Sequence, residues 1–170
     1  DERVGCVAPR GLTRVGNEIW FIDDEGLIRR LYQTDFDAFR RDIICNKIMD
    51  TIATINKTHL AKACAWTYND KVYFAVPTNS ATENNTVLVY DIVASRRTGE
   101  EAWTVYTGWT PSVFCDYHAS SEVQLYWGAN ADGDVFVHDG DDDNGVAIDA
   151  RWDGKEDDYD SAAKYKRYKY

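Results

Sequence analysis

The sequence predicts an all-β fold built from repeated four-stranded antiparallel units. Aromatic residues make up 14% of the 170 residues, with 6 Trp and 11 Tyr among them. They recur together with β-branched residues in short runs, and such residues pack well on a pleated sheet. Proline and methionine are scarce, at 3 and 1 residues. Three pairs of apolar runs joined by polar turns follow one another along the chain, which is the pattern of an internal repeat.

The first predicted hairpin covers residues 16–32. A strand that reads Asn-Glu-Ile-Trp-Phe-Ile is followed by a turn at residues 23–26 and by the strand Leu-Ile-Arg-Arg-Leu-Tyr. The later hairpins repeat this order of strand, polar turn and strand.

Residues 35–55 break the pattern. Their apolar residues fall at mixed helical spacings, with Thr34 or Asp35 as N-cap. We therefore expect a helical insertion, in one or two pieces, that replaces or interrupts the outer strand of the first unit. We favour packing of its apolar face on the edge of that unit over binding of a partner helix. The apolar positions are Phe36, Phe39, Ile43, Ile44, Met49, Ile52 and Ile55.

The second hairpin covers residues 69–91, with an apolar strand before it at 64–68 and an outer strand after it at 102–107. Alternation predicts that alternate residues of each hairpin strand share one face of the sheet. On the first strand these are Val72, Phe74 and Val76, and on the second they are Thr86, Leu88 and Tyr90.

The third hairpin covers residues 121–139, preceded by a strand at 112–117 and followed by one at 146–152. Four antiparallel strands per unit, with units spaced about 50 residues apart, are typical of propeller blades. A sandwich meander is the alternative, and it requires no similarity between hairpins.

The chain thus supplies about two and a half blades, whereas propellers have four to eight. We expect one propeller segment over residues 1–170, part of a larger propeller or longer polypeptide or completed by another copy. Its blade-like units are 1–60, 61–110 and 111–163, and 164–170 start the next strand.

The net charge of −10 and the pI of about 4.7 disfavour nucleic acid and anionic lipid as partners. No apolar stretch reaches the roughly 18 residues that a membrane span requires. Four scattered cysteines, with disulfides or a metal site as the alternatives, are expected to be buried thiols. They are Cys6, Cys45, Cys64 and Cys115.

Acidic residues gather near the end of the third hairpin and are the candidates for a calcium site. The spacing does not fit a twelve-residue EF-type loop, because Gly133 or Gly145 at its sixth position puts Gly128 or Gly140 at the first. We prefer a solvated acidic turn, with a non-EF calcium site as the alternative, and we expect no cofactor. The candidates are Asp132, Asp134, Asp139, Asp141, Asp142 and Asp143.

No catalytic residue is predicted. His59, His118 and His138 lie far apart in the sequence, and no Gly-X-Ser-X-Gly elbow accompanies them. A glycosidase would need two carboxyl groups about 5 to 9.5 Å apart. The spacing of acidic residues along the sequence does not reveal such a distance in space. Hence we do not expect an enzyme.

Three further features have a structural and a binding interpretation. The run 164–170 mixes cations with aromatics and could stack on bases or sugars, but strand alternation explains it more simply. Two Asn-X-Thr triplets begin at Asn56 and Asn84 and matter only in a secreted eukaryotic protein. Six tryptophans are expected mainly to pack in the core, with sugar-binding platforms as the alternative. They are Trp20, Trp66, Trp103, Trp109, Trp127 and Trp152.

Over nearly all of its length, the sequence resembles the β-propeller domain of large virion proteins of tailed bacteriophages, including tail nozzle and tail tubular proteins. Single motifs recur in unrelated propellers, and their order carries the resemblance. The motifs are Val15–Ile22 with Asp24–Arg29, Tyr73–Pro77 with Leu88–Asp91 and Trp103, Leu125–Gly128 with Asp132–Phe136 and Asp143–Ile148, and Lys164–Arg167.

The resemblance implies a non-enzymatic structural component of a phage virion, located in the tail or neck. Its partners would be other virion proteins, in an assembly that includes a homo-oligomeric ring. The alternative function is a carbohydrate-binding propeller that serves host adhesion or acts as a lectin.

Overall fold

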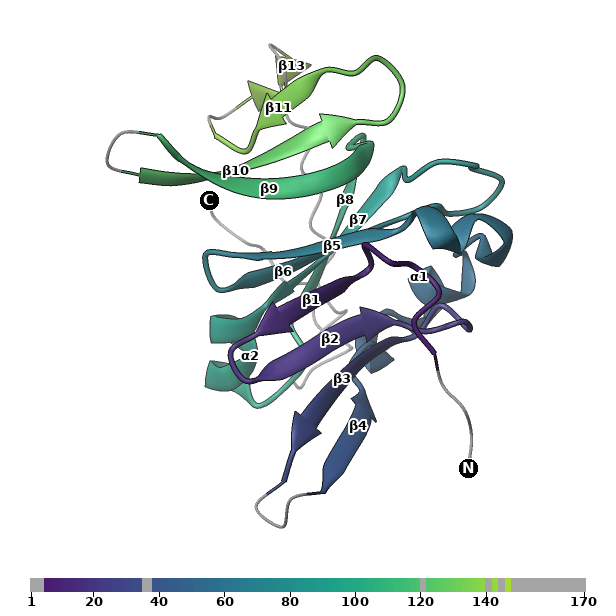
Figure 1. Cartoon of the computed structure of the whole chain (residues 1–170), viewed down its shortest axis with the longest axis vertical. Helices are drawn as coiled ribbons and strands as arrows, with labels where there is room; N and C mark the ends of the chain where they lie inside the picture. The colour runs from purple at the N-terminus through teal and green to yellow at the C-terminus, as the bar shows by residue number, and fades with distance from the viewer. Residues whose placement is uncertain (1–4, 35–37, 120–121, 140–141, 144–145, 148–170) are drawn as a thin grey trace, which may run out of the picture. The chain divides into compact units, whose positions relative to one another are not determined.

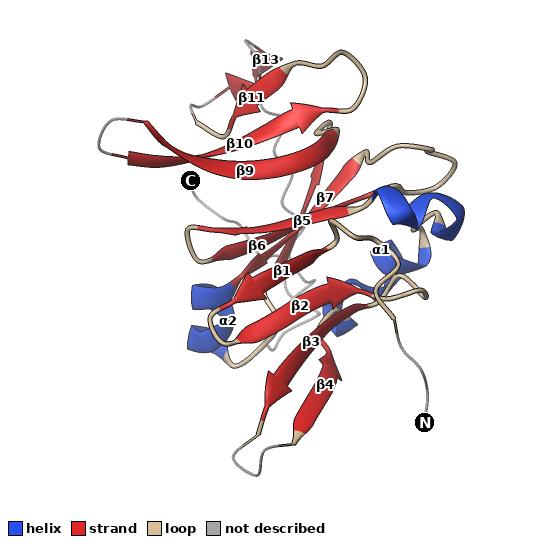
Figure 2. Ribbon diagram, in the orientation of Figure 1, coloured by secondary structure: helices blue, strands red, loops and turns tan. Residues whose placement is uncertain are grey.

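The computed structural model describes residues 5–34, 38–119, 122–139, 142–143 and 146–147. The chain divides into two compact units, residues 1–139 and 140–170. Within the described part the first unit is mostly β, with antiparallel sheets and short helices (Figures 1 and 2). The second unit is described only at β12 (Asp142–Asp143), which pairs with β13 (Val146–Ala147). No described helix has the length and apolar character needed to cross a membrane.

The first sheet confirms the predicted hairpin at residues 16–32. Its β2–β3 turn is held by the buried carboxylate of Asp23, which accepts hydrogen bonds from the backbone N–H groups of Glu25 and Leu27 and from Arg29 Nε. Gly26, at φ 83°, supplies the left-handed residue that this turn requires. The strands, in spatial order, are β1 (Leu12–Val15), β2 (Glu18–Ile22), β3 (Ile28–Gln33) and β4 (Phe39–Ile43).

The strand β4 corrects the predicted helical insertion at residues 35–55. The edge of β3 offers unpaired backbone groups, and residues 39–43 pair with it in register from Gln33↔Phe39 to Arg29↔Ile43. A new helix there would first have to nucleate, whereas an existing strand edge is a ready template. Thr34 is no N-cap, since its N–H and hydroxyl both bond to the Ala38 carbonyl oxygen. Asp35 and Phe36 lie outside the described residues.

The helical part of this segment is short. It consists of the 3-10 turn η1 (Asn46–Ile48) followed by α1 (Met49–Ala53). Ile44, Ile52 and Ile55 are buried in the first core cluster, whereas Met49 is exposed. The mixed helical spacing therefore combined two exposed residues of a strand, Phe39 and Ile43, with residues after the strand and in the short helix that are buried in one core.

The second sheet confirms the predicted strands at 64–68, 69–91 and 102–107. Its strands are β5 (Cys64–Tyr68), β6 (Lys71–Val76), β7 (Thr86–Asp91) and β8 (Trp103–Thr107), in that spatial order. The 3-10 helix η2 (Lys57–Lys62) precedes β5. The helix α2 (Ile92–Thr98), which the sequence interpretation missed, follows β7; Asp91 caps its first turn and Gly99, at φ 73°, ends it.

The third sheet has three described strands. They are β9 (Pro111–Ala119), β10 (Glu122–Ala129) and β11 (Val135–Val137), with β10 in the centre. The outer strand predicted at 146–152 does not join them among the described residues. Residues 146–147 pair instead with β12, and residues 148–152 lie outside the described part.

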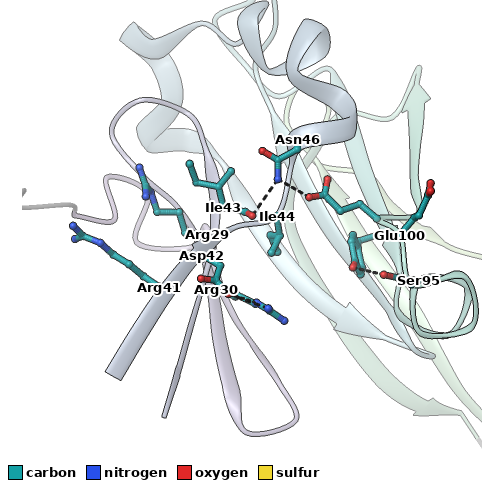
Figure 3. Close-up of a pocket in the computed structure, with 12 residues that line it drawn as sticks. Arg29, Arg30, Arg41, Asp42, Ile43, Ile44, Asn46, Ser95 and Glu100 are labelled. Atoms are coloured by element: carbon teal, nitrogen blue, oxygen red, sulfur yellow. Dashed lines mark hydrogen bonds and ion pairs between the residues drawn. The ribbon is translucent and has the colours of Figure 1, made fainter. Parts of the chain in front are cut away.

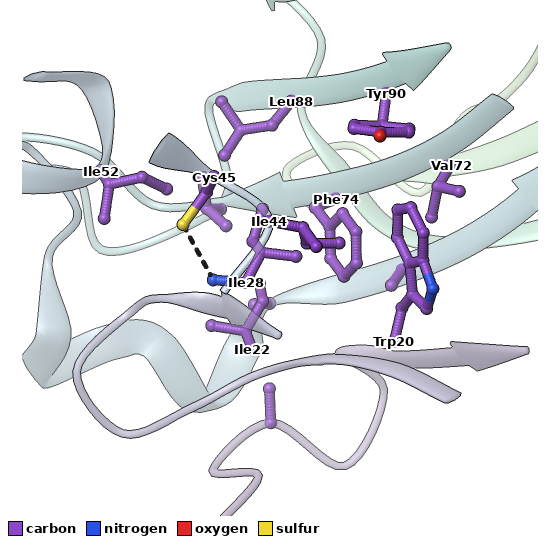
Figure 4. Packing of buried hydrophobic residues seen from close by; sticks show 14 of the residues in the cluster. Trp20, Ile22, Ile28, Ile44, Cys45, Ile52, Val72, Phe74, Leu88 and Tyr90 are labelled. Carbon is purple, nitrogen blue, oxygen red and sulfur yellow. Dashed lines mark hydrogen bonds between the residues drawn. The ribbon is translucent and has the colours of Figure 1, made fainter. Parts of the chain in front are cut away.

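The second sheet is buried on both faces. One face packs on the first sheet, through Val72, Phe74, Val76, Leu88 and Tyr90, in a cluster that also holds Trp20, Ile22 and Ile28 (Figure 4). The face assignments made from alternation are thereby confirmed, including buried Thr86, whose hydroxyl pairs with that of Thr78. The other face packs on the third sheet, through Tyr73, Ala75, Val87 and Val89 against Phe114, Leu125 and Trp127.

The first strand of each sheet lies beside the first strand of the next. Strand β5 contacts both β1 and β9. The Arg10 carbonyl oxygen, just before β1, accepts a 2.8 Å hydrogen bond from Ala65 N. The Arg10 guanidinium then donates to the Ser112 carbonyl oxygen at 3.1 Å. The described residues form sequential antiparallel sheets but no closed propeller.

The prediction of four buried thiols is half wrong. Cys45 and Cys64 are buried, but Cys6 and Cys115 are exposed, and all four are free. Cys6 precedes the first strand and is only partly covered by its neighbours, and Cys115 alternates with buried Phe114 on β9.

Candidate protein-docking surfaces

The predicted calcium residues are dispersed where the structure describes them. Asp132 and Asp134 are exposed in the β10–β11 turn, and Asp139 accepts a hydrogen bond from Gln124 Nε2 at 3.2 Å. Asp142 and Asp143 lie in β12, and Asp141 lies outside the described part. The described residues include no cluster of three or more acidic, His or Cys side chains suited to a metal ion.

The three histidines also form no metal-binding cluster among the described residues. His59 lies in η2, His118 is exposed on β9, and His138 is half-buried at the end of β11. The His138 ring meets Trp109 and Tyr73 edge to face, at centroid distances of 5.1 and 6.1 Å. Burial lowers the pKa of His138, and the positive charge of Lys71 lowers it further. This environment stabilises a neutral ring packed in an aromatic cluster.

The five described tryptophans pack in the core, as predicted. Trp20 and Trp127 are buried, and Trp66, Trp103 and Trp109 are partly buried against the clusters. Trp109 and Trp127 stack at a centroid distance of 5.6 Å, and Trp127 stacks on Phe136 at 4.4 Å. Trp152 lies outside the described residues.

The two Asn-X-Thr asparagines are structural. Asn56 caps η2 by accepting a hydrogen bond from Thr58 N. Asn84 is 2% exposed, and its side-chain amide donates to the carbonyl oxygens of Lys62 and Pro111. An amide nitrogen held in this way is not available to carry a glycan in the folded chain.

A polar groove of about 670 Å³ lies beside strands β3 and β4 (Figure 3). Its arginines are matched by acids: Arg30 pairs with Asp42 at 3.0 Å, and Arg29 pairs with Asp23. Asn46 donates to Glu101 at 2.7 Å. The two ion pairs lie within the first sheet and its β2–β3 turn, whereas the Asn46–Glu101 bond joins η1 to the segment before β8, so these contacts have a structural role.

A three-residue pattern that recurs in each sheet supplies side chains through which neighbouring sheets pack. The second strand of each sheet carries an aliphatic residue followed by two aromatics: Ile19-Trp20-Phe21 in β2, Val72-Tyr73-Phe74 in β6 and Leu125-Tyr126-Trp127 in β10. In β6 and β10 the outer two residues of the triplet are buried against the preceding sheet. In β2 and β6 the middle residue is buried against the following sheet, where Trp20 meets Tyr90 and Tyr73 meets Phe114.

The first sheet has one face outside the core, which we call the leading face. Cross-strand pairing puts Ile19 of β2 on it, opposite Arg14 and Leu31, and puts Phe21 on it, opposite Leu12 and Arg29. Leu12 is 48% and Ile19 40% exposed. Phe39, Arg41 and Ile43 of β4 share this face. The leading face therefore combines exposed apolar side chains with arginines.

The third sheet also has one face outside the core, which we call the trailing face. Pairing aligns Tyr126 of β10 with Cys115 and Val137 across the sheet, and Gly128 with Val113 and Val135. Val135 is 70% exposed, and Tyr117, on the same face of β9, is 63% exposed. Glu122 and Asp139 add negative charge to this face. The trailing face is thus apolar with an acidic margin.

Neither exposed face was predicted from the sequence, although the sequence of β2 indicated that both of its sides are apolar. Glu-Ile-Trp-Phe-Ile is apolar at consecutive positions, and so has apolar residues on both sides of the strand. A strand with one solvated face alternates apolar with polar, whereas a strand that is apolar throughout is covered on both faces. The fold and its surfaces define a stack of antiparallel sheets with two apolar end faces. Comparison with protein families, curated proteins and solved structures found no match.

Proposed function

We propose that this chain is a non-enzymatic structural module, a β-propeller segment that docks on other proteins through its end sheets in the tail or neck of a phage virion. The observation that carries the docking role is the pair of apolar end faces on sheets whose other faces are already packed. Contiguous exposed apolar surface on a rigid sheet is typical of an interaction site.

The propeller assignment is supported by the arrangement of the sheets. Propeller blades are four-stranded antiparallel sheets that follow one another around a central axis. Here β1, β5 and β9 are neighbours, and each of the first two sheets packs one face on the next sheet. Further blades placed against the leading and trailing faces would continue this arrangement.

The virion assignment is supported by the order of the hairpin motifs, which resembles that in tail nozzle and tail tubular proteins. It predicts that the polypeptide containing this sequence is a stoichiometric component of purified phage particles. Quantitative mass spectrometry of particles, with antibody labelling in electron microscopy, tests this. Signal at the tail or neck is expected, and absence from intact particles would overturn the assignment.

The carbohydrate-binding alternative receives less support. A tryptophan platform needs an exposed ring face, whereas the five described tryptophans are packed in the two core clusters. Glycan-array binding that is lost in Trp66→Ala, with the fold retained, would favour this alternative over a purely structural role.

A further inference from the structure

We infer that the partner of the trailing face is the leading face of a second copy of this chain, so that copies associate head to tail. This inference rests on the docking role proposed above and names its partner. The association pairs two different surfaces. Such heterologous contacts produce rings when the rotation closes and open filaments when it does not.

The first argument is the repeated triplet. In β2 and β6 the middle aromatic contacts an aromatic ring of the next sheet, with Trp20–Tyr90 at 5.0 Å and Tyr73–Phe114 at 6.1 Å. In β10 the corresponding residue is Tyr126, which lies on the trailing face. Trp20 and Tyr73 both pack against the next sheet. By the same pattern, we expect another sheet to pack against Tyr126.

The triplet also indicates how the first sheet packs, this time against a preceding sheet. The outer triplet residues of β6 and β10 are buried against the preceding sheet, with Val72, Phe74 and Leu125 all at 0% exposure. The corresponding residues of β2 lie on the leading face, where Ile19 is 40% exposed and Phe21 is 9% exposed. The leading face therefore suits packing against a preceding sheet, and the trailing face suits packing against a following sheet.

Charge gives a second, independent argument. The leading face carries the exposed Arg14, and the trailing face carries the exposed Glu122. Joining unlike faces brings opposite charges together, whereas joining two leading or two trailing faces brings like charges together. Electrostatic complementarity therefore selects the head-to-tail pairing over the symmetric ones.

The test uses one acidic substitution on each face. Ile19→Glu alters the leading face and Val135→Glu the trailing face. Val93→Glu, on the exposed side of α2 and on neither face, is the matched control. Circular dichroism and thermal unfolding first check that each variant is folded, and sedimentation velocity over a concentration series then measures association.

The unaltered chain and Val93→Glu should gain mass with concentration beyond the 19.4 kDa monomer. Ile19→Glu and Val135→Glu, each alone, should associate at least about tenfold more weakly. An equimolar mixture of these two variants should form a dimer and nothing larger, because one intact leading face meets one intact trailing face.

Three results would overturn the inference. A chain that stays monomeric at every concentration would show that the trailing face does not bind the leading face of a second copy; the docking role would then depend on the particle measurement. Continued association of each single variant alone would show that each face pairs with its own kind or that the contact lies elsewhere. A mixture that stays monomeric, although the unaltered chain associates, would show that the leading and trailing faces do not bind each other.

Discussion

The side chain of Asn84 donates a 2.8 Å hydrogen bond to the carbonyl oxygen of Pro111, and this bond joins the second sheet to the third. Asn84 ends the loop between β6 and β7, and Pro111 begins β9. The same amide donates to the Lys62 carbonyl oxygen at 2.9 Å, and Asn130 Nδ2 donates to the Asn84 carbonyl oxygen. One buried residue thereby connects three segments.

Replacing Asn84 should therefore destabilise the chain. Asn84→Ala removes the donor from two carbonyl oxygens at a buried site, which costs about 1–3 kcal/mol. Chemical denaturation measures the loss. Thr82→Ala, at an exposed position of the same loop, should stay close to the parent stability. Equal stability of the two variants would show that the Asn84 bonds contribute nothing net.

Two phenylalanines provide a matched test of the core. Phe74 is fully buried between the first and second sheets, whereas Phe39 on β4 is 70% exposed. Phe74→Ala should cost about 3–5 kcal/mol because it leaves a cavity. Phe39→Ala should change the stability of the monomer by less than about 0.5 kcal/mol. Denaturant titration of both variants checks the contrast, and a large loss in Phe39→Ala would contradict the assigned faces.

Trp103 ties the outer strands of two sheets together. Its Nε1 donates to the Ile44 carbonyl oxygen at 2.8 Å, and its ring meets Tyr90 edge to face. Trp103→Phe keeps a ring but removes the donor, so we expect a loss of about 0.5–1.5 kcal/mol. An unchanged free energy of unfolding in Trp103→Phe would refute this account.

The four thiols should differ in reactivity. Burial raises the pKa of Cys64 to about 12, and it also raises the pKa values of Cys45 and Cys6. Because the thiolate is the reactive form, Cys115 should react first with a disulfide reagent at pH 8. Cys6 should follow, and the buried pair should react only on unfolding. Mass spectrometry of labelled peptides checks the order, and rapid labelling of Cys64 in the folded chain would contradict it.

His138 should make stability depend on pH. Burial lowers its pKa in the folded state below the unfolded value of about 6.5, and Lys71 adds to this effect while Asp139 opposes it. Below pH 6.5 the unfolded state binds the proton more readily, so stability is full above this pH and falls as the pH drops towards the folded pKa. His138→Gln should flatten this slope, measured by denaturation between pH 7.5 and 5. A slope in His138→Gln equal to that of the unaltered chain would contradict this account.

Hairpins were the most predictable part of the fold. The strands β5, β6 and β7 lie where alternation and polar turns put them, and Val72, Phe74 and Leu88 point to the predicted face. Alternation works here because a strand places successive side chains on opposite faces, so burial leaves a period of two in the sequence. The packing role of the tryptophans followed from their size.

Segments whose apolar residues come from two kinds of element were misread. Phe39 and Ile43 belong to a strand and Ile52 to a short helix, so their combined spacing imitated one amphipathic helix. The helix α2 was missed because it is short, and only Ile92 in it is buried. Secondary structure of this length depends on neighbouring sheets for stability more than on its own propensity.

By itself the sequence determined the hairpins β2–β3, β6–β7 and β10–β11, because these depend on neighbours that are close along the chain. The tertiary structure alone decided which face of each sheet is covered. Ile19 and Val72 occupy equivalent places in their strands, yet Val72 is buried and Ile19 is 40% exposed. The difference arises because burial of a sheet face depends on whether another sheet lies against it, and that contact joins residues far apart in the chain.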